Sequence, residues 1–468
     1  MDSIKRHKGF LQHMSLRGAL ATKQSSLLWQ PSNSWIASLT LAMTLILMFF
    51  TALPSNAKSI KKVIAESGIN KSAVAISIKD VHTGKTVFAY NQNHTMLPAS
   101  TLKLITYSAA LDKLGKDYEF ITTLYKTTNN DLILKLGADP YLTSFLLDSM
   151  IETAKAKGIL APKTFYIDDS ILDATEWGEG WQWDDSLNPL MPKFSAYNLD
   201  SNLLTVLIDP TTSDSPANIR TTKFYPVTFM NLVTTGSMNK VEFSRTNHIS
   251  PDIITVQGTV ASQISTQIPV NNPQRYFKLR LEDAIRKQKI DYYAGFKNIK
   301  TPQDNIYTVK EIKHSISMAQ DDILQNSSNL AAETVFKLSG GVQNVNEYCQ
   351  RQDLDMDDIR IVDGSGVSKN NIMTADFMSG FLLKEAPWLE DLLPTPGQGT
   401  LKNRMLYFKG NLRAKTGTLS DVSAIAGYIT TMKGKTYAFD IMINDPKSKS
   451  NDKKLLEEYI LRTVHKNY

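Results

Sequence analysis

Ser100 and Lys103 stand three residues apart at the start of a segment whose apolar residues have helical spacing. Residues at i and i+3 share one helix face, so the Lys103 amine can reach the Ser100 hydroxyl and act as its base. Free N–H groups at a helix N-terminus would also favour attack by such a nucleophile. Five serines of the chain have Lys three residues later. The pair alone therefore also fits a helix cap followed by a solvated lysine.

A second candidate group is Ser327-Ser328-Asn329, which lies where two predicted helices meet. A hydroxyl and an amide one residue apart could relay a proton and hold a substrate carbonyl. Ser-x-Asn occurs four times in the chain, however. A helix–helix turn capped by Ser327 or Ser328 explains the pattern equally well.

The third group, Lys415-Thr416-Gly417, is the only Lys-Thr-Gly in the chain and lies in a strand-like segment. Its glycine and the following Thr418 would let a substrate backbone approach closely. The alternative is a strand with an exposed lysine and a glycine bulge. A phosphate loop has the pattern G-x-x-x-x-G-K-[ST], with a first glycine well before the lysine. No Lys-Thr pair of this chain has that first glycine, which excludes a Walker motif.

Composition excludes several other functions. The 468 residues are 42% hydrophobic and 21% charged, which is typical of a globular chain of two or three domains. Cys349 is the only cysteine, so the chain has no internal disulfide and no multi-cysteine metal site. Its seven histidines form no His-Glu-x-x-His pair, which argues against a zinc hydrolase.

The N-terminus has the pattern of an export signal. Basic residues precede an apolar stretch from Trp35 to Leu53, and Ser55-Asn56-Ala57 offers small residues to a signal peptidase. We predict a signal peptide over residues 1–57, although the apolar stretch is also long enough for an uncleaved anchor. These residues carry a net charge of +4 out of the formal +6. The remaining +2 gives little support for nucleic-acid binding.

The predicted elements give a mixed α/β fold. A strand–turn–strand–helix unit begins near Ser72, and a strand, a hairpin and an amphipathic helix end the chain. Such ends suggest one sheet completed by both termini. We therefore expect a catalytic domain formed by residues 58–118 and 305–468, with an inserted, mainly β region at 119–304.

Taken in chain order, the three groups are the SxxK, SxN and KTG elements of active-site serine penicillin-recognising enzymes. The sequence resembles the class C low-molecular-mass penicillin-binding proteins, a D-alanyl-D-alanine carboxypeptidase/endopeptidase family. The stretches GWQWDD (180–185), VDGSGVSKNN (362–371) and PGQGTLKNRM with RAKTGTLSDVSAIAGY (within 396–428) match that family too. The resemblance implies a penicillin-recognising serine transpeptidase-like domain carrying an insertion.

The resemblance also implies roles for the catalytic residues. Ser100 would attack the carbonyl of the penultimate D-alanine, and Lys103 would be its base. For that, burial and a neighbouring cation such as Lys415 must bring the Lys103 pKa down towards neutrality. Ser327 would pass a proton to the leaving amine, and Asn329 would hold an amide carbonyl of the substrate.

Substrate binding would fall to the strand and to two outlying residues. Lys415 would hold the terminal carboxylate together with the hydroxyls of Thr416 and Thr418, and Gly417 would give the substrate access. The backbone N–H groups of Ser100 and Thr418 would form the oxyanion hole. Asp185 and Lys369 are candidates for gripping the stem-peptide side chain, although a solvated surface pair explains them as well.

The implied partners are peptidoglycan stem peptides and β-lactam antibiotics, without nucleic acid, cofactor or metal. An exported, periplasmic or otherwise extracytoplasmic location follows, and peripheral membrane association is compatible with it. Two departures from the family pattern are Ser328, where Asp is common, and Lys369, where Arg is usual. Two rival functions share the motifs, a serine β-lactamase and a non-catalytic peptidoglycan-binding or penicillin-sensing protein.

Overall fold

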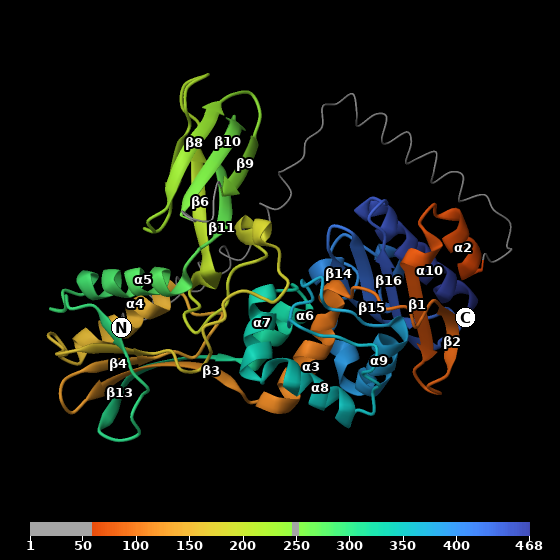
Figure 1. The fold of residues 1–468 in the computed structure, drawn as a ribbon, viewed down its shortest axis with the longest axis horizontal. Helices are drawn as coiled ribbons and strands as arrows, with labels where there is room; N and C mark the ends of the chain where they lie inside the picture. The colour runs from red at the N-terminus through yellow and green to blue at the C-terminus, as the bar shows by residue number, and fades with distance from the viewer. Residues whose placement is uncertain (1–58, 246–251) are drawn as a thin grey trace, which may run out of the picture.

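The computed structural model describes residues 59–245 and 252–468. Its centre is an antiparallel five-stranded sheet in the order β14-β15-β16-β1-β2 (Figure 1). The strands are β1 (Val74–Asp80), β2 (Thr86–Tyr90), β14 (Leu412–Thr418), β15 (Val422–Thr430) and β16 (Thr436–Asn444). Ile76 of β1 pairs with Ile441 of β16, so the two ends of the chain complete one sheet.

Helices cover both faces of this sheet, which explains why β15 reads as an almost continuous apolar run. On one face, α10 (Ser450–Asn467) packs on the sheet and on α2 (Ile60–Glu66). On the other face lie α3 (Lys103–Leu114), α6 (Ile316–Leu324), α7 (Asn329–Leu338), α8 (Gly341–Arg351) and α9 (Ala375–Leu389). The active-site motifs belong to this second layer and to β14.

A second five-stranded sheet, in the order β12-β5-β4-β3-β13, stands beside the helices of the second layer (Figure 1). The helix α4 (Ser144–Ala156) packs against it, and α5 (Pro273–Lys287) packs on α4 and shares its apolar core. The strands are β3 (Glu119–Thr127), β4 (Leu132–Lys135), β5 (Phe165–Asp168), β12 (Phe296–Asn298) and β13 (Ile306–Ser315).

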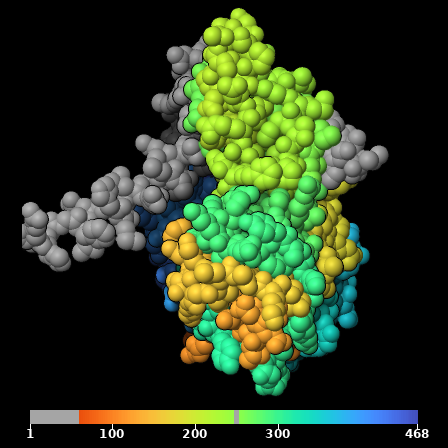
Figure 2. Space-filling view, turned by 90° about the vertical axis from the view of Figure 1, so that its left-hand side faces the viewer, coloured from red at the N-terminus to blue at the C-terminus, as the bar shows by residue number. Residues whose placement is uncertain are grey.

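Two three-stranded sheets, β8-β10-β9 and β11-β6-β7, form a lobe that projects from the rest of the molecule (Figure 2). Its apolar side chains belong to the same core cluster as those of the second five-stranded sheet. The strands are β6 (Leu203–Asp209), β7 (Asn218–Thr221), β8 (Thr228–Thr235), β9 (Lys240–Arg245), β10 (Ile253–Val260) and β11 (Ile264–Pro269).

The mixed α/β fold with a mainly β insertion is therefore confirmed. The domain boundaries stay a prediction, and the pairing of β13 with β3 along its length favours an insertion that ends after Ser315 instead of residue 304. The predicted signal peptide, residues 1–57, lies outside the described residues. Within residues 59–245 and 252–468, no helix is both long enough and apolar enough to cross a membrane.

Candidate active site

Ser100 lies in a 3-10 turn, Ala99–Leu102, that leads directly into α3. Ala99 has a left-handed φ of 48°, which places a strained residue immediately before the serine. Neither the turn nor α3 has a side-chain cap, so the interpretation of Ser100 as a helix cap is wrong. Its hydroxyl is partly exposed and lines a pocket.

Two glycines allow neighbouring segments to approach this turn closely. A Cβ on Gly417 of β14 would come within 2.9 Å of the Ser100 nitrogen, and a Cβ on Gly366 would come within 1.9 Å of the Ala99 carbonyl oxygen. Gly366 also has a φ of 78°. The strand and the loop can therefore meet the Ser100 turn only with glycine at these positions.

Lys103 is fully buried behind Ser100. Its Nζ atom lies 2.9 Å from Ser100 Oγ, and it donates to Asn329 Oδ1 at 2.7 Å and to the Ser365 carbonyl at 2.6 Å. The interpretation of Lys103 as a solvated lysine is wrong, because no part of its side chain reaches the surface.

Burial lowers the pKa of Lys103 from 10.5 to about 7, while the nearby Asp363 and Glu333 carboxylates raise it. Loss of solvation is thus the largest effect. The amine is neutral in a substantial fraction of molecules at neutral pH, as a general base requires.

The sequence leaves open whether Ser327 or Ser328 caps the helix. The structure distinguishes them at the junction between α6 and α7. Ser328 caps α7, because its hydroxyl accepts a hydrogen bond from the Ala331 N–H at 3.2 Å. Ser327 has a left-handed φ of 66° and receives a 2.7 Å hydrogen bond from Lys415 Nζ. The cap and the candidate proton relay are therefore different residues.

Lys415 is fully buried in β14, so it is not an exposed strand lysine. Besides Ser327, its Nζ donates to the Thr416 carbonyl at 2.9 Å. Burial first, and then the charge of Lys103, hold the pKa of Lys415 well below its ordinary value. The two buried amines repel each other when both carry a proton, which favours states with at least one neutral lysine.

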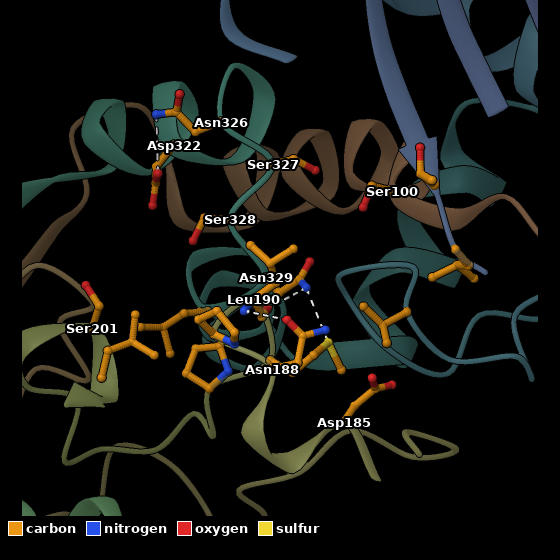
Figure 3. A pocket seen from close by; sticks show the side chains of 18 of the residues that line it. Ser100, Asp185, Asn188, Leu190, Ser201, Asp322, Asn326, Ser327, Ser328 and Asn329 are labelled. Atoms are coloured by element: carbon orange, nitrogen blue, oxygen red, sulfur yellow. Dashed lines mark hydrogen bonds between the residues drawn. The ribbon is translucent and has the colours of Figure 1, made fainter. Parts of the chain in front are cut away.

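A pocket of about 1000 Å³ opens in front of these groups. In Figure 3, Ser100 and Ser327 lie on one side of the cavity and Asp185 lies across from them. Lys369 also lines it, but its ion-pair partner, at 3.8 Å, is Asp421 and not Asp185. The structure thus gathers these predicted residues around one cavity: Ser100, Asp185, Ser327, Asn329, Lys369, Thr416 and Thr418.

The inserted region supplies much of the pocket wall opposite Ser100. It also contacts the side-chain amide of Asn329. Asn329 Nδ2 donates to the Leu190 carbonyl at 2.8 Å (Figure 3). This contact fixes the orientation of the amide, so that its oxygen faces Lys103. An amide nitrogen carries two N–H bonds. One is taken by Leu190, and the nitrogen also lies 3.5 Å from the sulfur of Met191, a weak acceptor that a substrate carbonyl could replace.

Sequence reasoning missed a buried layer behind the pocket. The Asp363 carboxylate accepts hydrogen bonds from the Trp181 indole at 2.8 Å and from the N–H groups of Gly366 and Ser368. Glu333 accepts from the N–H groups of the loop at residues 364 and 365. The available clue was Glu333 itself, the one acidic residue in the helix NLAAETVFKL.

Among the described residues, no group of three or more His, Cys, Asp or Glu side chains could hold a metal ion. The thiol of Cys349 is buried in the core next to α3 and α9, away from the pocket. The groups that surround Ser100 are hydroxyls, amines and amides.

A serine beside a buried lysine, a second serine on a helix junction and a Lys-Thr-Gly strand define a penicillin-recognising serine hydrolase, and the fold is of that class. The model of the D-Ala-D-Ala carboxypeptidase 3 (S13) family matches residues 56–462. The chain belongs to this family, which confirms the family predicted from the motifs.

Individual relatives agree. The chain is 26% identical to a D-alanyl-D-alanine carboxypeptidase of Actinomadura sp. (strain R39), over 83% of this chain and 80% of the relative. It is 23% identical to the D-alanyl-D-alanine carboxypeptidase DacB of Haemophilus influenzae, over 80% and 85%. A crystal structure of penicillin binding protein 4 (dacB) from that organism superposes with a TM-score of 0.77 at 21% identity, covering 87% of this chain and all of the other.

Proposed function

We propose that the protein is a serine-type D-Ala-D-Ala carboxypeptidase/endopeptidase that acts on peptidoglycan stem peptides through an acyl-enzyme at Ser100. The family assignment supports the reaction class. The contact between Ser100 Oγ and the buried Lys103 amine, at 2.9 Å, is the observation on which the assignment of residues rests.

The surroundings of Lys103 explain how a lysine serves as base. A neutral amine has two N–H bonds and one lone pair. The carbonyl oxygens of Asn329 and Ser365 take the two N–H bonds, so the lone pair points towards the Ser100 hydroxyl. The hydroxyl then loses its proton to Lys103 as its oxygen attacks the carbonyl carbon of the penultimate D-alanine.

The resulting oxyanion would be held by the backbone N–H groups of Ser100 and Thr418. Close packing of Gly417 against the Ser100 turn supports this assignment, since it brings β14 to the turn. Each such donor contributes about 3 kcal/mol to transition-state stabilisation. The C–N bond breaks next, and the leaving amine takes up a proton through Ser327, which Lys415 contacts at 2.7 Å. Water hydrolyses the remaining ester and regenerates the Ser100 hydroxyl.

Lys415 would bind the terminal carboxylate of the substrate with the hydroxyls of Thr416 and Thr418. A carboxylate that enters this site favours the protonated amine and offsets the effect of burial on its pKa. Asn329 would offer its second N–H to an amide carbonyl of the peptide. Asp185 and Lys369, which line the far part of the same pocket, would bind the stem-peptide side chain.

We also propose an extracytoplasmic location, because stem peptides lie outside the cytoplasmic membrane. The basic and apolar N-terminal sequence and the Ser55-Asn56-Ala57 site support export with cleavage after Ala57. N-terminal sequencing of exported protein tests this, with Lys58 expected as the first residue. A first residue before Trp35 would indicate a retained anchor instead.

The function is tested by release of D-alanine from a pentapeptide ending in D-Ala-D-Ala. The wild-type protein should release one D-alanine per peptide, and Ser100→Ala should release none above background because no ester can form. Ser328→Ala is the matched control, since that hydroxyl caps α7 and should leave D-alanine release largely intact. Release by Ser100→Ala at the wild-type rate would contradict the proposal.

A further inference from the structure

We propose that Glu333 is a positioning residue for the reaction, because it helps to hold the loop whose Ser365 carbonyl orients the Lys103 amine. Glu333 does not touch Ser100 or the pocket. It acts through the loop at residues 363–366, on the inner side of the active site. The inference rests on the proposed function, in which Lys103 is the base.

The loop is held from two helices. Glu333 Oε1 accepts from the Ser365 N–H at 2.8 Å, and both of its oxygens accept from the Gly364 N–H at 3.1 Å. From α3, the Thr106 hydroxyl donates to the Gly364 carbonyl at 2.7 Å. Two N–H groups and one carbonyl of consecutive residues are thus fixed by buried side chains.

This clamp holds the peptide plane just before the Ser365 carbonyl. The carbonyl itself shares a plane with the Gly366 N–H, which donates to Asp363 Oδ1 at 2.9 Å. With both planes held, the Ser365 carbonyl is directed at Lys103 Nζ, 2.6 Å away. It takes one of the two N–H bonds of the neutral amine. If this carbonyl turned away, the amine could rotate and its lone pair would no longer face Ser100.

Sequence spacing explains why Glu333 can take this position. It lies four residues after Asn329 on α7, so both side chains lie on the face of the helix that is turned towards Lys103. Gly364 lets the loop approach that helix, since a Cβ there would come within 2.5 Å of Phe336 Cβ. One helix therefore presents both partners of the base, Asn329 directly and Glu333 through the Ser365 carbonyl.

The charges around Lys103 determine what its pH profile can report. The charged groups facing Lys103 are Glu333 from α7, Asp363 from the loop and Lys415 from β14. Burial, together with the Asp363 charge, raises the pKa of Glu333 to about 8, close to that of Lys103. With that pKa the Glu333 carboxyl is mostly protonated where Lys103 titrates, so replacing it by the neutral amide of Gln removes little charge from beside Lys103.

The test is the rate of acylation by benzylpenicillin as a function of pH, measured by intact-protein mass. In Glu333→Gln we expect the limiting rate to fall about tenfold or more, since small displacements of a catalytic group are costly. Because Gln replaces a mostly protonated acid that lies outside the pocket, we expect the acidic limb and the apparent affinity for benzylpenicillin to stay at their wild-type values. Glu385→Gln is the matched control: Glu385 is equally buried, bonded to Tyr348, and lies outside the site.

Thr106→Val removes the other side of the clamp without changing charge. It should lower the limiting rate of acylation several-fold and leave the acidic limb at the wild-type pH. If Glu333→Gln does not fold, the Thr106→Val rate tests the proposal by itself. A Glu333→Gln profile equal to that of the wild type overturns the inference. So does a loss that lies in the affinity for benzylpenicillin instead of the limiting rate, or a Thr106→Val rate equal to that of the wild type. Absence of acylation in the wild-type protein would instead overturn the proposed function.

Discussion

Lys103 and Lys415 are two amines in one buried site, and their environments give them different tasks. Lys103 contacts Ser100 and two carbonyl acceptors, whereas Lys415 belongs to β14 and contacts Ser327 and the Thr416 carbonyl. From the sequence we predict that burial and the neighbouring Lys415 cation together lower the Lys103 pKa. Burial is the largest cause, and the effect of charge between the lysines is seen most clearly at Lys415.

Lys415→Ala tests this division at the residue scale. Loss of a charge-assisted hydrogen bond to the substrate carboxylate, worth about 1.5 to 3 kcal/mol, should lower kcat/KM about tenfold or more. Removal of a neighbouring cation raises the Lys103 pKa, so less base is neutral at a given pH. The acidic limb of the pH profile of kcat/KM should therefore move to higher pH, starting from a wild-type midpoint near the Lys103 pKa of about 7.

A peptide with an amidated C-terminus serves as control for this variant. It has no carboxylate for Lys415 to bind, so the loss in kcat/KM should be much smaller for it than for the acid. A Lys415→Ala protein with wild-type kcat/KM on the acid peptide would show that Lys415 has no part in the site.

Several site residues could be predicted from the sequence because their partners are local. The i, i+3 spacing places Lys103 beside Ser100, and a unique Lys-Thr-Gly in a strand-like run places Lys415 in β14. Glu333 and the Ser365 carbonyl could not be predicted in the same way. Their contacts join α7 and α3 to a loop, and a backbone carbonyl leaves no trace in residue type.

At the scale of elements, the site depends on how closely β14 and a loop pack on the Ser100 turn. A Cβ added to Gly417 of β14 would lie 2.9 Å from the Pro98 carbonyl oxygen and from the Ser100 nitrogen. Gly366 of the loop packs in the same way against the Ala99 carbonyl. A sequence pattern can flag a glycine in a strand, but only tertiary packing shows which backbone it meets.

Gly417→Ala tests whether this approach matters. The added methyl group would push β14 away from the Ser100 N–H, so we expect benzylpenicillin acylation to slow by about tenfold to a hundredfold. Far-ultraviolet circular dichroism should remain that of the wild type. Gly380→Ala in α9 is the control: its Cβ would have ordinary contact, 3.8 Å to Leu354, and acylation should not change. Equal acylation rates in both variants would remove Gly417 from the site.

On the scale of the whole molecule, the pocket is shared between the central domain and the inserted region. The insertion provides the Leu190 carbonyl that orients Asn329 and the Trp181 indole that binds Asp363. Trp181 packs in a small cluster with Met191, Phe194 and Leu330. The hydrogen bond from Trp181 to Asp363 joins residues 182 positions apart, so no local sequence pattern could predict it.

The fold class was predictable because both ends of the chain carry strand patterns and a helix. The boundaries of the insertion were harder to predict. A strand such as β13 has the same alternating pattern whichever sheet it joins, and only its pairing with β3 assigns it to the second sheet. Position in the chain is therefore a weak guide to domain membership where one domain is inserted in another.

The central claim is that Ser100 forms an acyl-enzyme, and intact-protein mass followed over time after addition of benzylpenicillin tests it most directly. We expect one long-lived adduct of one β-lactam mass per protein, located by peptide mapping at Ser100 and absent from Ser100→Ala. Rapid loss of the adduct with turnover of the drug would indicate a β-lactamase, and no adduct would indicate a non-catalytic protein. An adduct on Ser327, or an unchanged adduct in Ser100→Ala, would contradict the assignment of the nucleophile.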